Sequence, residues 1–241
     1  MRVAALYDIH GNLPALDAVL HDVATETPDA IVIGGDVAAG PMPAETLDRL
    51  IGLGGLLYVI QGNADRELLQ PPSGRDVWAE RARWAAKLLA PAHRALLKAP
   101  PLLRLTIEGL GPTLFCHGSP RSDEEILTRL TPESSVAPMI DGIGEHTVVC
   151  GHTHVQYDRQ AAGVRIVNAG SVGMPYEGTP GARWAMLGPE VSLRCTEYDL
   201  DAATDQMTAG GMPAVDELIA DLRSPPSGDE ASEHFERLAR G

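Results

Sequence analysis

The chain has 241 residues, enough for one sizeable α/β domain or two small ones, and 44% hydrophobic residues, which excludes a disordered protein. Its formal net charge of -14 argues against broad nucleic-acid binding, which requires basic surface. Three isolated cysteines, no signal-peptide pattern and no apolar stretch approaching the ~20 residues that span a bilayer predict a cytoplasmic protein without a membrane segment.

The first part of the chain alternates strand and helix patterns. In chain order, we expect a strand at 2–7, a helix at 13–24, a strand at 30–33, a helix at 43–53 and a strand at 56–60. The right-handed crossover rule places these three strands side by side in one sheet. A longer helical pattern follows, which Pro91 breaks or kinks. It covers residues 76–97.

The second part of the chain is richer in hairpins. Strands at 102–107 and 112–116 are expected to pair around a glycine turn, and a helix is expected at 123–130. Further short strands are expected at 147–150, 156–160, 164–167, 183–187 and 191–198. This asymmetry predicts two sheets packed face to face with helices outside, in a single domain over residues 1–200.

Residues 201–241 change in character and are predicted to form a helical extension of the same domain. A helix is expected at 214–222 and a linker at 224–229, and residues 230–240 are either a polar helix or frayed. The extension either packs on the core or mediates homo-oligomerisation, and both alternatives stay open.

Five short motifs carry metal-capable side chains, and four of them directly follow a predicted strand. They are Asp8-Ile9-His10, Gly34-Gly35-Asp36, Gly62-Asn63-Ala64-Asp65, Cys116-His117-Gly118 and Gly151-His152-Thr153-His154. Functional groups of α/β sheets gather at the carboxyl ends of strands. Read singly, the Asp8 and Asp36 motifs are also typical of helix caps and turns. The two histidines after Cys150 are a sharper signal, because two buried rings without a partner would be costly.

Together the motifs resemble the full signature of the calcineurin-like metallophosphoesterases, in the right order. The similarity is greatest to the small prokaryotic phosphodiesterase-like branch, which ends its core with a stretch like 168–173. The resemblance implies an αββα sandwich of two mixed sheets flanked by helices. It implies one ion held by Asp8, His10 and His154, another held by Asn63, His117 and His152, and a bridge at Asp36. Nitrogen and oxygen ligands without thiolate favour two divalent transition-metal ions, of Mn, Fe, Zn, Ni or Co.

The implied activity is hydrolysis of a small phosphodiester or activated phosphoester by a metal-bound hydroxide. Dinucleoside polyphosphate hydrolysis, a broad phosphatase and a non-catalytic scaffold are the alternatives. Many family members have a histidine directly after the asparagine, where it is proposed to protonate the leaving group. Here this position is Ala64, although its usual carboxylate partner, Asp65, is present. A missing general acid costs about 10²–10⁴-fold in rate.

Three polar residues lie just beyond the ligand positions and are candidates for phosphate contact or ligand support: Asn12, Arg66 and Arg121. For the arginines, solvated surface is the competing interpretation. The candidate catalytic residues are therefore Asp36, Asn63, Asp65 and Asn12. The tryptophans, Trp78, Trp84 and Trp184, are predicted to pack in the core or against helices.

Overall fold

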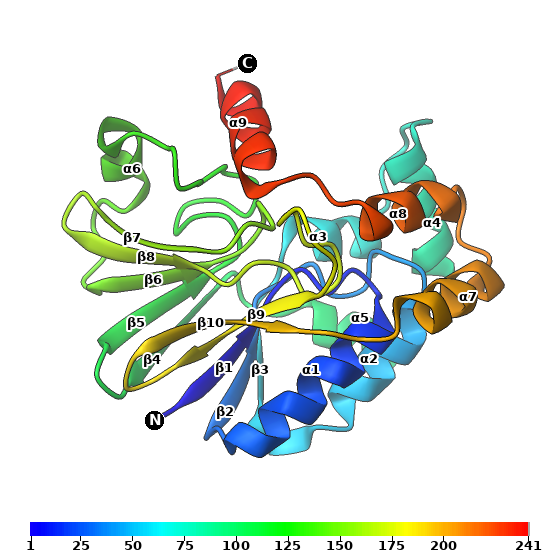
Figure 1. Cartoon of the computed structure of the whole chain (residues 1–241), viewed down its shortest axis with the longest axis horizontal. Helices are drawn as coiled ribbons and strands as arrows, with labels where there is room; N and C mark the ends of the chain where they lie inside the picture. The colour runs from blue at the N-terminus through cyan, green and yellow to red at the C-terminus, as the bar shows by residue number, and fades with distance from the viewer. Residues whose placement is uncertain (241) are drawn as a thin grey trace.

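Two mixed β-sheets of five strands each form the centre of residues 1–240, the part of the chain that this computed structural model describes (Figure 1). The first sheet has the order β10 (Val191–Thr196), β9 (Ala182–Leu187), β1 (Val3–Leu6), β2 (Ala30–Ile33), β3 (Leu57–Val59). The second has the order β4 (Leu102–Ile107), β5 (Gly111–Cys116), β6 (Thr147–Cys150), β8 (Val164–Asn168), β7 (Tyr157–Ala161). Strands β1, β2 and β3 lie side by side, as predicted, and are parallel; β5, β6 and β8 are also parallel.

Alternation along β1 explains why the two sheets stack. Val3 and Ala5 face the second sheet, where they pack with Phe115 and Val149, while Ala4 and Leu6 face the helices. Every residue of β1 is fully buried, so the strand has apolar residues on both faces. The sheet-to-sheet core thus lies beneath the carboxyl end of β1, where the first motif begins.

Helices cover the outer faces of both sheets. Those that lie against the first sheet are α1 (Leu13–Glu26), α2 (Pro43–Ile51), α3 (Asn63–Leu69), α4 (Val77–Leu88) and α5 (Pro91–Leu97). The second sheet is covered by α6 (Glu133–Met139). The fold is therefore the predicted sandwich. The long helical pattern is broken at Pro91, one of the two predicted alternatives, because α4 ends at Leu88 and Pro91 is the first residue of α5.

The helix predicted over residues 123–130 is wrong. This segment is irregular, and the helix of this region, α6, begins after Pro132. Side chains supply the reason: the backbone N–H of Thr128 donates to the Thr131 hydroxyl, and the N–H of Leu130 donates to the Thr128 hydroxyl. Such bonds compete with the helical pattern of backbone hydrogen bonds.

The C-terminal extension consists of α7 (Leu200–Gly210), α8 (Val215–Arg223) and α9 (Gly228–Ala239), of which α7 was not predicted. A methionine-rich cluster that includes Met42, Met174 and Met207 packs α7 and α8 onto the core. Ser227 and Glu230 form a capping box that begins α9, so the last segment is helical rather than frayed. The end of the predicted extension, residue 241, lies outside the described residues.

None of the helices within residues 1–240 combines the length and the apolar character needed to span a membrane.

Candidate metal centre

The loops that leave β1 and β2 run side by side and carry the first two motifs. The backbone N–H of Asp8 donates to the Gly35 carbonyl at 3.1 Å, and that of His10 donates to the Asp36 carbonyl at 2.9 Å. These bonds continue the parallel pairing of the strands beyond the sheet. They hold both aspartates at one edge, the carboxyl end of the strands.

Five of the predicted ligands have an unusual backbone conformation. Their φ angles are positive: 53° at Asp8, 46° at His10, 53° at Asp36, 64° at His152 and 58° at His154. Residues with a Cβ rarely adopt this region, and each such residue costs of order 1–3 kcal/mol when the surrounding structure imposes it. Such strain is typical of functional sites, and here it is concentrated at one edge of the sheets.

Three histidines converge around the carboxylate of Asp8, and one of them also lies next to Asp36. Its Oδ1 lies 3.4 Å from Nε2 of His154, 3.9 Å from Nε2 of His10 and 3.8 Å from Nε2 of His117. Nε2 of His117 is also 3.4 Å from Oδ2 of Asp36. These side chains form two compact groups that could each hold a cation: Asp8, His10 and His154, and Asp8, Asp36 and His117.

Three of the histidines are oriented by backbone carbonyls. Nδ1 of His10 lies 3.3 Å from the Ala39 carbonyl, Nδ1 of His117 lies 2.8 Å from that of Gly34, and Nδ1 of His154 lies 2.7 Å from that of Met174. Since a carbonyl only accepts, each Nδ1 carries a proton and donates it. Each ring therefore directs its Nε2 toward the carboxylates, as metal-binding histidines do, and this nitrogen can bind a metal ion whenever it carries no proton.

Two further features of the site fit a bound cation. Nε2 of His10 and Nε2 of His154 face each other at 3.2 Å, so two lone pairs meet when both Nδ1 atoms carry the proton. Oδ1 of Asp8 is buried and has no hydrogen-bond partner within residues 1–240. Buried carboxylate oxygens are normally paired, and a divalent ion bound by these atoms would pair all three.

The charges of the site agree with this interpretation. Burial alone would raise the pKa of Asp8 and Asp36, but the neighbouring imidazoles outweigh it and hold both pKa values below the ordinary range. Burial would lower the pKa of His117, yet the carboxylates of Asp36 and Asp8 raise it to about 10. Ionised carboxylates thus attract a proton onto His117, a role that a bound cation would take over.

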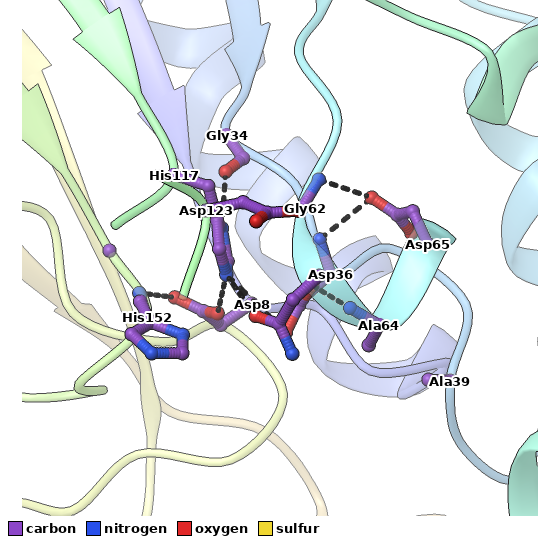
Figure 2. Close-up of polar contacts among 12 residues, drawn as sticks. Asp8, Gly34, Asp36, Ala39, Gly62, Ala64, Asp65, His117, Asp123 and His152 are labelled. Carbon is purple, nitrogen blue, oxygen red and sulfur yellow. Dashed lines mark hydrogen bonds and ion pairs between the residues drawn. The ribbon is translucent and has the colours of Figure 1, made fainter. Parts of the chain in front are cut away.

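The remaining predicted ligands, Asn63 and His152, lie beside these groups. Oδ1 of Asn63 is 3.1 Å from Nε2 of His117, and the ring centroids of His152 and His117 are 5.2 Å apart. The backbone N–H of His152 donates to Oδ2 of Asp8 at 2.9 Å (Figure 2). The structure thus brings all seven predicted ligands to one place.

Two candidate catalytic residues, Asp65 and Asn12, use their side chains in hydrogen bonds within the protein. Asp65 accepts from the N–H groups of Asp36, Val37 and Gly62 at 2.8–3.1 Å, on the far side of Asp36 from His117 (Figure 2). Asn12 caps α1, and its side-chain amide donates to the Gly173 carbonyl and the Tyr198 hydroxyl. Of the two roles predicted for Asn12, these contacts favour ligand support.

The arginines beyond the motifs are bound by acidic side chains. Arg66 donates to Asp123 and Glu124, and Arg121 donates to Glu125. These contacts favour the interpretation of both arginines as solvated surface.

A cavity of about 410 Å³ opens beside the ligands. Several lining residues were missed in the sequence: Glu67, Met174, Tyr176 and Phe235. Trp78, predicted to pack, also lines the cavity and is 54% exposed, whereas Trp184 is buried as expected. Phe235 comes from α9, and no local pattern could connect so distant a residue with the motifs.

The sequence profile of the calcineurin-like phosphoesterase superfamily domain matches residues 1–188. The chain belongs to this superfamily. It is therefore a metal-dependent phosphoric ester hydrolase, and the superfamily resemblance of the motifs is confirmed.

Individual proteins resemble the chain in sequence or in fold. Phosphodiesterase YfcE of Escherichia coli K12 is 26% identical over 200 residues, which cover 79% of this chain and 89% of that protein. The crystal structure of a metallophosphoesterase from Sphaerobacter thermophilus has a TM-score of 0.74 and 26% identity, covering 92% of this chain and 98% of that one. Protein PH1004 of Pyrococcus horikoshii OT3 shares the fold, with a TM-score of 0.81, 21% identity and the same two coverages.

Proposed function

We propose that the chain hydrolyses phosphodiesters or activated phosphoesters at a centre of two divalent metal ions. The proposed ligands are Asp8, His10 and His154 for one ion, Asn63, His117 and His152 for the other, and Asp36 between them. The observation that carries this proposal is the orientation of three histidines by backbone carbonyls, which turns their Nε2 atoms toward two buried carboxylates.

The ligand set suits a phosphate substrate. Bound divalent ions would supply a nucleophile by lowering the pKa of water, and would offset charge on the phosphate oxygens. Asp8 and Asp36 contribute two negative charges and the asparagine and neutral imidazoles none, so the loaded site would be positive. A positive site attracts phosphate despite a formal net charge of -14 for the whole chain.

Ala64 narrows the substrates toward diesters and activated esters. It lines the cavity, and its methyl group cannot give a proton to a leaving group. Its backbone N–H donates to Oδ1 of Asp36 at 2.8 Å, so the residue helps to place a carboxylate instead. The similarity to a protein named phosphodiesterase supports the same substrate class.

A metal-loaded kinetic comparison tests the proposal. Purified protein with Mn²⁺ should hydrolyse bis-p-nitrophenyl phosphate in preference to p-nitrophenyl phosphate. Asp36→Asn and His152→Ala should each abolish turnover. His21→Ala, which changes an exposed histidine of α1, is the matched control and should leave the rate unchanged.

Two results would contradict the proposal in different ways. A preference for the monoester would refute the diesterase assignment and favour a broad phosphatase. Full activity of both site variants would refute the ligand assignment. Dinucleoside polyphosphate hydrolysis is the remaining alternative. A higher rate on a dinucleoside polyphosphate than on bis-p-nitrophenyl phosphate, measured in the same series, would favour it.

A further inference from the structure

Aromatic side chains are concentrated around the cavity beside the ligands. The chain has two phenylalanines, three tryptophans and five tyrosines, and one of each lines this cavity: Phe235, Trp78 and Tyr176. The lining also includes the small or apolar residues Ala39, Ala82 and Met174. A chain with 4% aromatic residues thus places three of them beside its metal-ligand candidates.

The aromatic rings continue directly from the ligands. The ring of Tyr176 stacks on His154, with centroids 4.8 Å apart and planes inclined by 24°. Phe235 follows at 6.3 Å from Tyr176 and at 6.5 Å from His152. Both rings are half-buried and share the cavity with the ligands, so a group next to a bound phosphate would meet an aromatic face.

The helix that carries Phe235 is fixed in place. One carboxylate oxygen of Glu236, the next residue on α9, accepts from the hydroxyls of Thr128 and Thr131 in a buried network. Arg129 forms an ion pair with Asp229 at the start of the helix. These contacts attach α9 to the irregular segment outside the second sheet, so Phe235 is part of a rigid wall rather than of a loose tail.

The cavity has little to offer a second anionic group. Among the described residues that line it, Arg81 is the one arginine or lysine. Its guanidinium already donates to the carbonyls of Pro213 and Ala214 and pairs with Glu217. A flat uncharged ring fits this lining better than a sugar phosphate or a polyphosphate does.

We infer that the cavity bounded by Trp78, Tyr176 and Phe235 is a stacking site for a nucleobase. This base belongs to the same substrate as the phosphoester group that is hydrolysed. This inference rests on the proposed function, since it takes the neighbouring ligands to bind the phosphate. Stacking tolerates different bases because every base has a π face. Phe235 and Trp78 are then specificity-determining residues that bind the base. The bond that is hydrolysed is the P–O ester bond at the metal ligands.

Calorimetric titration of the Mn²⁺-loaded protein tests the inference without requiring turnover. The probes are adenosine 5′-monophosphate and ribose 5-phosphate, which share the phosphate and sugar and differ in the base. The nucleotide should bind about tenfold more tightly, the lower part of the range for stacking one base. Phe235→Ala and Trp78→Ala should each remove most of this difference and leave the affinity for ribose 5-phosphate unchanged.

Leu238→Ala is the matched control for α9. Leu238 is 56% exposed, lies on the same helix as Phe235 and does not line the cavity. This variant should keep the full preference for the nucleotide. An equal loss in Leu238→Ala and Phe235→Ala would assign the effect to the helix as a whole and overturn the role of the ring.

The inference and the proposed function fail separately. Equal affinity for the two probes, or no binding of either at millimolar concentration, would overturn the stacking site even if the enzyme hydrolyses bis-p-nitrophenyl phosphate. A nucleotide preference that depends on Phe235, in a protein without metal-stimulated turnover, would support the stacking site and refute the phosphoesterase proposal.

Discussion

Oδ2 of Asp8 accepts a hydrogen bond from the backbone N–H of His152 at 2.9 Å, while Oδ1 of the same carboxylate faces three histidine nitrogens. One oxygen therefore joins the loop after β6 to the end of β1, and the other remains for a cation. This division makes Asp8 both a structural link and the central ligand of the proposed site.

Asp8→Asn should separate these two roles. The amide keeps the shape of the side chain but loses the negative charge that attracts a divalent ion. At a metal concentration of 100 Kd, the wild-type free energy of unfolding should rise by about 2.7 kcal/mol, and in this variant by less than about 1 kcal/mol. Urea unfolding with and without Mn²⁺ measures both values. Asp205→Asn, an exposed change on α7, should retain the full increase.

Metal binding should release a proton, and the pKa values predict from where. The carboxylates raise the pKa of His117 to about 10, so this ring is charged at neutral pH until a cation displaces its proton. Burial and the charge of His117 lower the pKa of His152 to about 4, so His152 is already neutral and releases none. The affinity for metal should therefore increase with pH from 6 to 8, by up to about tenfold per unit.

Calorimetry in buffers of different ionisation enthalpy measures this proton release directly. The wild-type protein should release about one proton from His117 on metal binding at pH 7. His117→Ala should release correspondingly fewer. Binding that is independent of pH and buffer would show that His117 is not a ligand.

Asp65→Ala should destabilise the fold even without metal. Its carboxylate accepts from three buried N–H groups, those of Asp36, Val37 and Gly62. Each unpaired buried donor costs ~1–3 kcal/mol, so the variant should lose at least about 3 kcal/mol of unfolding free energy. Asp65→Asn keeps one oxygen acceptor and should lose less. Equal stability of Asp65→Ala and the wild type in urea would contradict this structural role.

The ligand motifs could be found in the sequence because each lies at a strand end, where chain order and side-chain type carry the signal. Their backbone strain could not be predicted, since the positive φ of Asp8 and Asp36 is imposed by bonds between the loops. The short helix α3 was missed because Gly62-Asn63 is typical of a turn. Its start depends on Asp65, whose carboxylate accepts from the N–H of Gly62, the residue before the helix.

The residues of the cavity wall, in contrast, could not be predicted from sequence patterns. Trp78 and Phe235 lie on α4 and α9, far apart in the chain, and both helices have ordinary amphipathic sequences. The position of Phe235 depends on tertiary contacts of its neighbour Glu236 with Thr128 and Thr131, in the very segment whose helix prediction was wrong. Periodicity reports which face of a helix is buried, but not which distant site that face adjoins.

Ala64→His should broaden the substrates of the enzyme. Ala64 follows Asn63 in the sequence and lines the cavity. The hydrogen bond from its backbone N–H to Asp36 does not depend on the side chain at this position. An imidazole there could protonate a departing alkoxide, an effect typically worth about 10²–10⁴-fold. The gain should be large for esters with basic leaving groups and small for bis-p-nitrophenyl phosphate, because nitrophenolate leaves without protonation.

The dependence of log kcat/KM on the leaving-group pKa measures this effect across a series of aryl and alkyl phosphodiesters. The slope should be steep and negative for the wild type and shallower for Ala64→His. Ala64→Gln places a polar side chain of similar size that has no titratable proton, so its slope should stay as steep as that of the wild type. Parallel slopes for all three proteins would mean that leaving-group protonation does not limit the reaction. The residue at position 64 would then not determine the substrate, and the metal ligands and the cavity wall would.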